Sequence, residues 1–277
     1  NYCSLTKPKV IISTTHLDKS FLYLKKKIYR DSKTILVQRC PYKKSDFGIQ
    51  NDKPEIDQTY LFNQKSIKII KKYINSKEFI LGSFNNNNQK KNKKKGNLIL
   101  VISGYKKNFE KIDISNNKDY FLNALHEKRT IKTIIDYLSK NYKIKILLKP
   151  DVKKSDYVNY SGIDKKYVIL NDGFPYKLID QSNLVITFND GTMGHETISR
   201  KVKNIQIPRK KKHNLNRFYI YKDKFDEIKI KNFLFKILKM KQKSYFAKMK
   251  KFHEDIVYFD YKNTLLRKNL INLIKQR

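Results

Sequence analysis

Short apolar runs alternate with amphipathic stretches along the chain, and this alternation limits the possible folds more than any other feature. The apolar runs are rich in β-branched residues and too short to be buried helices. Strands separated by helices form parallel sheets covered by helices, so the sequence predicts an α/β fold. The expected strands are residues 9–14, 34–38, 58–62, 78–81, 97–103, 143–148, 167–170, 184–188 and 204–207, and the expected helices are residues 20–29, 66–74, 119–141 and 175–181, followed by helical sequence over 227–277.

A polar segment divides this alternation into two halves, and a length of 277 residues agrees with two domains. The segment contains four consecutive asparagines and a dense lysine run at Lys90–Lys95. Such residues bury little apolar surface, so we expect a mobile linker. The predicted domains are an amino-terminal Rossmann-like domain, 1–81, a linker, 82–96, and a second Rossmann-like domain with the terminal helices, 97–277. Ser83, Asn85 and Asn86 are expected to line the cleft between the two domains.

The chain is strongly basic, with 62 Lys and Arg against 25 Asp and Glu and a formal charge of +37. This excess suggests a nucleic-acid-binding protein, because Lys and Arg neutralise phosphates. Three features weaken that interpretation. Arg, the preferred residue for phosphates and base edges, is a minority of the cations, the lysines are dispersed, and abundant Lys, Asn and Ile are explained by A+T-rich coding. We therefore favour attraction to an anionic membrane surface over nucleic-acid binding.

Two further observations concern location. The sequence contains no apolar run close to the roughly 20 residues that cross a bilayer and no signal peptide, so any membrane contact is expected to be peripheral. Cys3 and Cys40 form neither metal-ligand spacing nor a disulfide framework, which agrees with a reducing cytosol. The expected location is cytoplasmic, at the inner face of the cytoplasmic membrane.

The stretch Leu184–Glu196 has the pattern of a buried strand, a tight polar turn and the first turns of a helix. The glycine at 191 lets free backbone N–H groups gather at the helix N-terminus, where the helix dipole favours an anion. The sequence therefore predicts a phosphate site there, and Glu196, one turn further on, would accept hydrogen bonds from ribose hydroxyls. The phosphate-binding candidates are Asn189, Asp190, Gly191, Thr192 and Gly194. The alternative is that these residues only cap a helix and form a turn, as in any parallel α/β sheet.

Other polar residues follow predicted strands, at the edge where parallel sheets bind ligands. Candidates for the donor site are Ser103, Tyr105, Lys149 and Gly173. A surface position remains the alternative for Lys149. His16 and Asp18 follow the first strand and form a candidate acid–base pair, although loop residues of these types are usually at the surface. His126 and Glu127, within the long predicted helix, are expected on its solvent side.

The order of these pieces resembles that of the GT-B-type glycosyltransferases. The resemblance rests on Gly82–Asn86, Leu98–Ser103, Leu147–Pro150, Tyr176–Val185 and Asn189–Glu196. The chain is most similar to bacterial surface-carbohydrate and capsule biosynthesis proteins, and more distantly to CDP-glycerol glycerophosphotransferases and UDP-N-acetylglucosamine 2-epimerases. The likeness implies two Rossmann-like domains, with Thr192 and Gly194 near the donor phosphates and Glu196 at the ribose.

Two departures from the family pattern stand out. Asp151 follows the Lys-Pro pair where related proteins often have His. The first half is short by at least one strand–helix unit, and the chain starts at Asn1 instead of Met, so an incomplete first domain is expected.

The expected function is transfer of a sugar or phospho-polyol from a nucleotide-activated donor to a glycan or lipid-linked precursor of a bacterial surface polysaccharide. Helix-terminal N–H groups, Thr192 and Lys149 would stabilise the departing nucleotide diphosphate. No metal or cofactor is expected, because the protein supplies this charge and the sequence has no Asp-x-Asp pair. His16 and Asp18 would act on the acceptor. The alternatives are a UDP-sugar epimerase of similar fold, an inactive scaffold of the carbohydrate family and a basic nucleic-acid-binding protein.

Overall fold

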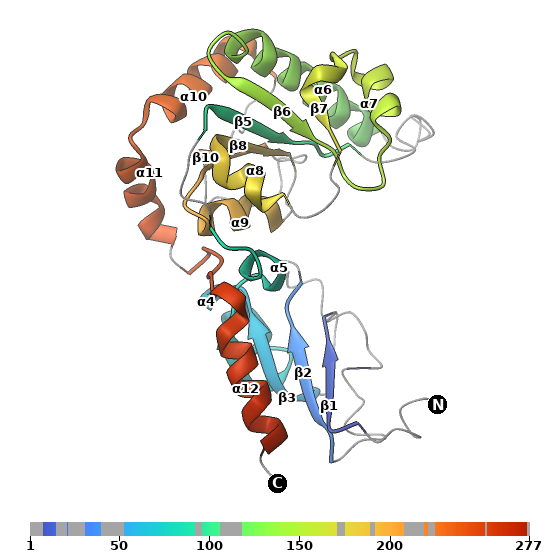
Figure 1. Ribbon diagram of the computed structural model, residues 1–277, viewed down its shortest axis with the longest axis vertical. Helices are drawn as coiled ribbons and strands as arrows, with labels where there is room; N and C mark the ends of the chain where they lie inside the picture. The colour runs from blue at the N-terminus through green and yellow to red at the C-terminus, as the bar shows by residue number, and fades with distance from the viewer. Residues whose placement is uncertain are drawn as a thin grey trace. The chain divides into compact units, whose positions relative to one another are not determined.

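The computed structural model of the chain divides into two α/β units (Figure 1). The first unit comprises Asn1–Lys90 together with His253–Arg277, and the second unit comprises Lys91–Phe252. The structure describes residues 8–14, 21, 31–39, 53–91, 96–105, 118–170, 175–188, 192–207, 219–220, 225–252 and 254–275. The predicted α/β fold of two sheets is confirmed, and the described strands lie close to their predicted ranges. The helix predicted at 20–29 lies, apart from Phe21, outside the described residues.

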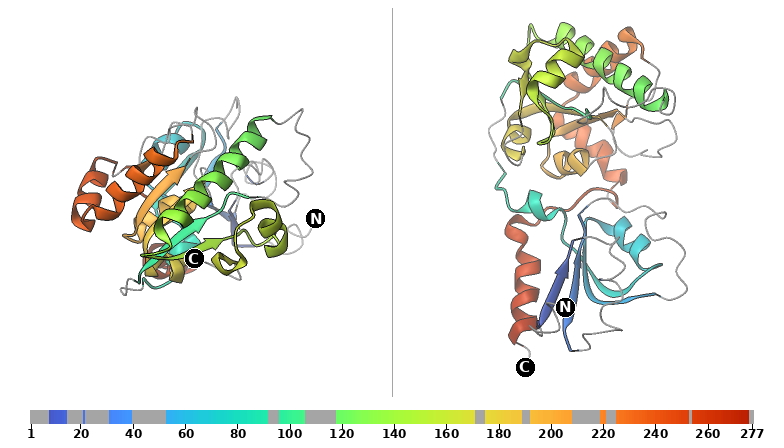
Figure 2. Two further views of the ribbon diagram at one scale, coloured as in Figure 1. Left: turned by 90° about the horizontal axis from the view of Figure 1, so that it is seen from above. Right: turned by 90° about the vertical axis from the view of Figure 1, so that its right-hand side faces the viewer.

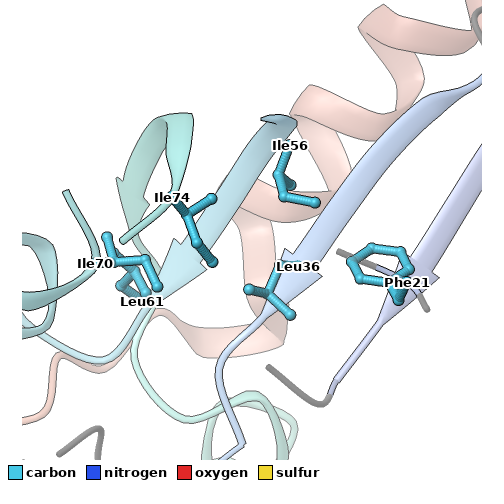
Figure 3. Packing of buried hydrophobic residues seen from close by; sticks show 6 residues of the cluster. All are labelled: Phe21, Leu36, Ile56, Leu61, Ile70 and Ile74. Carbon is cyan, nitrogen blue, oxygen red and sulfur yellow. The ribbon is translucent and has the colours of Figure 1, made fainter. Parts of the chain in front are cut away.

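The first unit contains a four-stranded parallel sheet in the order β1-β2-β3-β4. Its elements are β1 (Val10–Ser13), β2 (Lys33–Val37), β3 (Glu55–Leu61), α4 (Gln64–Ile70), β4 (Asn75–Ile80), α5 (Phe84–Asn87), a 3-10 turn at Tyr261–Asn263 and α12 (Thr264–Lys275). Asn63 starts α4 as its N-cap, accepting a hydrogen bond from the Ser66 backbone N–H. Aliphatic and aromatic side chains form two cores in this unit. One is drawn in Figure 3 and consists of Phe21, Leu36, Ile56, Leu61, Ile70 and Ile74.

The C-terminal segment belongs to the first unit, which differs from the predicted domain range of 97–277. Asn63 Nδ2 donates to the Asp255 carbonyl at 2.9 Å, Gly82 pairs with Phe259 in an isolated bridge, and Leu266 of α12 joins the second core of this unit. Figure 2 (right) shows α12 beside the first sheet. An amphipathic helix can cover either sheet, so sequence proximity to the preceding helices does not decide where it packs.

The asparagine-rich segment is partly ordered, contrary to the mobile linker predicted over 82–96. Asn86 and Asn87 are fully buried in α5. Asn87 Nδ2 donates to the Leu81 carbonyl (2.8 Å) and to Asn263 Oδ1 (2.9 Å), so hydrogen bonds replace the solvation of this amide. Ser83 is buried and Asn85 is exposed, both within the first unit. Their role in a cleft between the domains stays a prediction, and residues 92–95 lie outside the described part of the chain.

The second unit contains a six-stranded parallel sheet in the order β10-β9-β8-β5-β6-β7. Its strands are β5 (Leu98–Ile102), β6 (Lys143–Leu147), β7 (Val168–Ile169), β8 (Ser182–Phe188), β9 (Lys203–Ile207) and β10 (Tyr219–Ile220). Its helices are α6 (Lys118–Leu138), α7 (Lys154–Ser161), α8 (Tyr176–Gln181), α9 (Thr192–Ser199), α10 (Glu227–Lys239) and α11 (Gln242–Met249), with 3-10 turns at Lys165–Tyr167 and Lys250–Phe252. Apolar residues of α8 pack on Leu100, Leu147 and Val185 of the sheet, and α6 contacts α10. None of the helices in the described ranges has the length and apolar character that crossing a membrane requires.

Candidate functional site

In the sheet of the second unit, the side on which successive strands are added changes at β5, and this position marks a candidate site. From β5 the chain adds β6 and β7 on one side, and it then returns to add β8, β9 and β10 on the other side. The registers Ile102–Leu147 and Ile102–Thr187 bring the carboxyl ends of β5, β6 and β8 to the same edge. Open parallel sheets bind ligands outside the carboxyl ends of their strands at such a switch point. Residues that follow these three strands are therefore candidates for ligand contact.

Several predicted site residues lie outside the described residues. They are His16, Asp18, Gly173, Asn189, Asp190 and Gly191. The structure therefore describes the flanks of the predicted phosphate turn but not its centre. Phe188 ends β8 before it, and Thr192 begins α9 after it.

The turn after β5 is held by a buried carboxylate. Glu127 Oε1 accepts hydrogen bonds from Ser103 Oγ (2.7 Å) and from the Gly104 backbone N–H (2.8 Å). The Tyr105 N–H in turn donates to Ser103 Oγ at 3.1 Å. Ser103 and Tyr105, both candidates for donor contact, are buried, and the hydroxyl of Ser103 takes part in fixing the turn itself. Their roles toward a ligand stay predictions.

The predicted solvent-side position of Glu127 is wrong, because this side chain is only 7% exposed. Its neighbour His126 is half-buried, and burial lowers the pKa of that imidazole. The sequence contains a signal for the burial of Glu127. It lies four and seven residues before Ile131 and Ile134, so it shares their core-facing helical stripe.

Tyrosines line the same edge beside Glu127. Tyr157 of α7 is buried, and its burial, followed by the nearby Glu127 carboxylate, raises its pKa far above the usual range. The ring of Tyr105 meets Tyr157 edge-on, with centroids 5.5 Å apart, and lies 4.9 Å from the ring of Tyr160. Tyr157 therefore remains a neutral phenol at any physiological pH and contributes packing and hydrogen bonding without charge.

Gly194 has a packing role in the structure. A Cβ atom at this position would lie 3.2 Å from Thr187 Oγ1 and 3.3 Å from Asn204 Oδ1. The missing side chain therefore allows α9 to pack closely on β8 and β9. Lys149 is half-buried directly after β6, at the same sheet edge as the start of α9. The predicted contacts of Lys149, Thr192 and Gly194 with phosphate remain predictions.

Glu196 is buried and contacts a tyrosine from the neighbouring helix. It is only 3% exposed, and Tyr176 Oη donates a hydrogen bond to its Oε2 at 3.2 Å. Tyr176 is the first residue of α8 and is itself 1% exposed. Since α8 and α9 both run from the carboxyl edge of the sheet, this hydrogen bond joins the site ends of the two helices.

A buried ion pair lies one helical turn behind this contact, and the sequence interpretation missed it. Arg200 Nε donates to Asp180 Oδ1 at 2.7 Å, and Nη2 donates to Oδ2 at 2.6 Å. The two side chains are 0% and 2% exposed. The guanidinium carbon lies 5.2 Å from the centre of the Tyr176 ring. Asp180 follows Tyr176 by four residues and Arg200 follows Glu196 by four, which places each pair on one helix face. This spacing predicts the faces but not that they meet, so the sequence holds no signal for the ion pair itself.

In the described residues, no group of three or more His, Cys, Asp or Glu side chains is placed to hold a metal ion. The described groups at this edge are two carboxylates, hydroxyls, a lysine and helix N–H groups. Together these can bind an anionic group next to a group that carries hydroxyls.

No protein-family model matches the sequence, and no curated protein matches it. Solved structures do match. A mutant of the wall teichoic acid polymerase TagF with CDPG is 14% identical, with 97% of this chain and 72% of that chain covered and a TM-score of 0.55. The spinosyn rhamnosyltransferase SpnG with spinosyn aglycone is 9% identical, covering 97% and 74%, with a TM-score of 0.54. A mutant of TarM from S. aureus, in complex with fondaparinux, alpha-GlcNAc-glycerol and UDP, is 11% identical, covering 99% and 58%, with a TM-score of 0.51.

These identities are too low to transfer an activity, but the coverage includes both units. The likeness agrees with the two helix-covered parallel sheets of the two units. We conclude that the chain has the fold of the GT-B glycosyltransferases.

Proposed function

We propose that this chain is a glycosyltransferase-like enzyme that takes a nucleotide-activated donor. The observation that carries the proposal is the buried Glu196, held by Tyr176 at the carboxyl edge of the sheet, one turn inside α9 and beside the switch point. A carboxylate can only accept hydrogen bonds, so it suits the paired hydroxyls of a ribose. The GT-B fold supports this assignment, since two of the similar structures contain CDPG or UDP.

In the proposed mechanism, the amino end of α9 and Thr192 face the donor diphosphate, with Lys149 contributing positive charge. Negative charge grows on the diphosphate as the transferred group leaves, and preorganised N–H groups and a cation stabilise that charge. A protein that supplies this charge needs no metal ion for the step. The groups that act on the acceptor would come from the first unit, with His16 and Asp18 as candidates.

The proposed transferred group is a sugar or a phospho-polyol, and the proposed acceptor is a glycan or lipid-linked precursor of a bacterial surface polysaccharide. The names of TagF and TarM support this class, since one is a wall teichoic acid polymerase and the other was crystallised with alpha-GlcNAc-glycerol. A formal charge of +37 supports a cytoplasmic enzyme that works against an anionic membrane surface.

The direct test is calorimetry and thermal unfolding of the protein with nucleoside diphosphates, nucleotide sugars and single-stranded DNA at physiological salt. A ligand specific for the folded state, present at 100 times its dissociation constant, adds about 2.7 kcal/mol of stability. Glu196→Gln keeps an acceptor for Tyr176 and should weaken nucleotide binding about tenfold. Glu227→Gln, on an exposed part of α10, is the matched control and should bind normally. Stabilisation by DNA alone, or normal binding by Glu196→Gln, would refute the proposal.

A further inference from the structure

Four buried side chains connect α8 to α9 in two successive layers. Tyr176 and Asp180 lie four residues apart on α8, while Glu196 on α9 and Arg200 just after it have the same spacing. The first layer is the hydrogen bond from Tyr176 to Glu196, and the second is the Asp180–Arg200 ion pair. Because the spacing is equal on both helices, the two contacts lie one helical turn apart along the α8–α9 interface. We call these four residues the α8–α9 ladder.

The ion pair fixes how α8 lies against α9. Its two hydrogen bonds of 2.7 and 2.6 Å are bidentate, so they restrict both the distance and the angle between guanidinium and carboxylate. A buried ion pair contributes little net stability, because desolvation of both charges offsets their attraction. The main effect of this ion pair is instead structural, because it fixes the register of α8 relative to α9 at the site.

The same guanidinium also fixes the ring of Tyr176. It lies over one face of the ring, 5.2 Å from the centroid, while the ring belongs to the core cluster formed with Leu100, Ile179 and Val185. At 1% exposure the ring cannot change its rotamer without disturbing that core. The phenol oxygen therefore occupies one place, 3.2 Å from Glu196 Oε2.

We propose that Tyr176 is a positioning residue that orients the Glu196 carboxylate for the ribose hydroxyls of the donor, and that the Asp180–Arg200 pair maintains this alignment. The inference rests on the proposed function, which places a nucleotide at this edge. The hydrogen bond restricts the rotamers of the Glu196 side chain before a ligand binds, so less side-chain entropy is lost on binding. The ladder thereby sets a preference for ribonucleotides over nucleotides that lack the 2′ and 3′ hydroxyls.

The test compares UDP, CDP, ADP and GDP with their 2′,3′-dideoxy counterparts on wild-type protein and on Tyr176→Phe, by calorimetry. Tyr176→Phe keeps the ring and removes only the hydroxyl. We expect the ribonucleotides to bind about tenfold more weakly to this variant, with the dideoxy nucleotides unchanged, because a hydrogen bond to a charged group is lost. The preference for ribose should fall by the same factor.

The matched control is Tyr245→Phe. Tyr245 is fully buried in the same unit, and its hydroxyl donates to the Asn204 carbonyl and accepts from the Asn204 N–H. Its loss should lower thermal stability and leave the ribose preference intact. Arg200→Lys keeps the charge but loses the bidentate contact, and should reduce the ribose preference partially.

The outcomes separate this inference from the proposed function. A wild-type protein that binds none of these ribonucleoside diphosphates refutes the proposed function and this inference with it. A wild-type protein that prefers ribonucleotides, together with an unchanged preference in Tyr176→Phe, refutes the positioning role alone. Equal weakening of ribo and dideoxy nucleotides in Tyr176→Phe would show a merely structural role and would also refute it.

Discussion

The two units differ in what they bury. In the described part of the chain, every buried Asp, Glu, His, Lys or Arg side chain belongs to the second unit. These residues are Glu127, Asp180, His195, Glu196, Arg200 and Lys203. The polar side chains buried in the described part of the first unit are neutral. One of them is Gln38, which accepts a hydrogen bond from the Phe62 N–H at 2.6 Å. A buried charge lowers the stability of the fold unless it is paired. The concentration of buried charges in the second unit therefore indicates that this unit fixes the positions of particular side chains at a cost in stability.

The sheets differ in the same sense. The four described strands of the first unit lie side by side in chain order, whereas in the second sheet the strand order reverses at β5. Open parallel sheets bind ligands where the strand order reverses in this way. Glu127 accepts hydrogen bonds from the turn after β5, and Glu196 lies one turn inside α9. Lys203 shows that a buried charge need not serve a ligand. Its ammonium donates to the carbonyls of Ile237 (2.9 Å) and Leu238 (3.0 Å) and so terminates α10.

The largest expected effect comes from breaking the buried ion pair of the second unit. Arg200→Met leaves the Asp180 carboxylate buried without its guanidinium and should lower the free energy of unfolding by about 3–5 kcal/mol. The matched change in the first unit is Lys68→Met, which breaks an ion pair with Glu254 whose side chains are 59% and 41% exposed. That change should cost less than about 1 kcal/mol. Urea unfolding with hydrogen exchange resolved by unit measures both, and equal losses would contradict the comparison.

The next effect tests how the first unit holds the C-terminal segment. Gly82 has φ +84, and a Cβ atom there would overlap the carbonyl oxygen of Tyr258. Gly82→Ala should therefore destabilise the first unit by about 3 kcal/mol and speed hydrogen exchange in α12. Gly162→Ala in the second unit has φ +65 but meets no atom within 4 Å, so it should cost only about 1 kcal/mol. Similar losses of stability in the two variants would show that the close contact between residue 82 and the Tyr258 carbonyl has no influence on stability.

A smaller effect, of opposite sign, is expected where α9 ends. Lys201 has φ 64, in the left-handed region that glycine adopts more readily at the end of a helix. Lys201→Gly should raise the free energy of unfolding by about 0.5–1 kcal/mol, because relief of strain exceeds the added chain entropy. Lys262 in the first unit has φ 62, and Lys262→Gly provides the matched variant. Thermal unfolding measures both changes, and a lower melting temperature in either variant would argue against strain at that position.

The effect expected to be smallest at neutral pH concerns the pH dependence of stability. Burial, followed by the positive charges of Arg200 and Lys201, lowers the pKa of Lys91 from 10.5 to about 8. Between about pH 8 and 10.5 the unfolded chain keeps a proton on this lysine that the folded chain has lost. The contribution of Lys91 to stability should therefore rise with pH across this window. Unfolding measured from pH 7 to 10.5 should show a shallower rise in Lys91→Met than in wild type, and parallel curves would refute the assignment.

Much of the fold follows from local sequence. The alternation of strands and helices was predicted because apolar periodicity is a property of neighbouring residues, and the polar residues that follow the strands were placed by the same reasoning. The switch point could not be predicted, because strand order depends on which edges meet in space. Glu127 was recoverable from its spacing to Ile131, whereas its partners Ser103 and Gly104 lie on another element.

The sequence by itself therefore determined the α/β class, the succession of β8 and α9 and the position of Glu196 one turn inside α9. Only the tertiary structure decided that α12 packs on the first unit, that Tyr176 contacts Glu196 and that Asp180 pairs with Arg200. The physical reason is that each of these contacts joins residues from different elements, 20 positions apart in the two ladder contacts. Such contacts depend on which helix faces meet, and local periodicity predicts a face but not its partner.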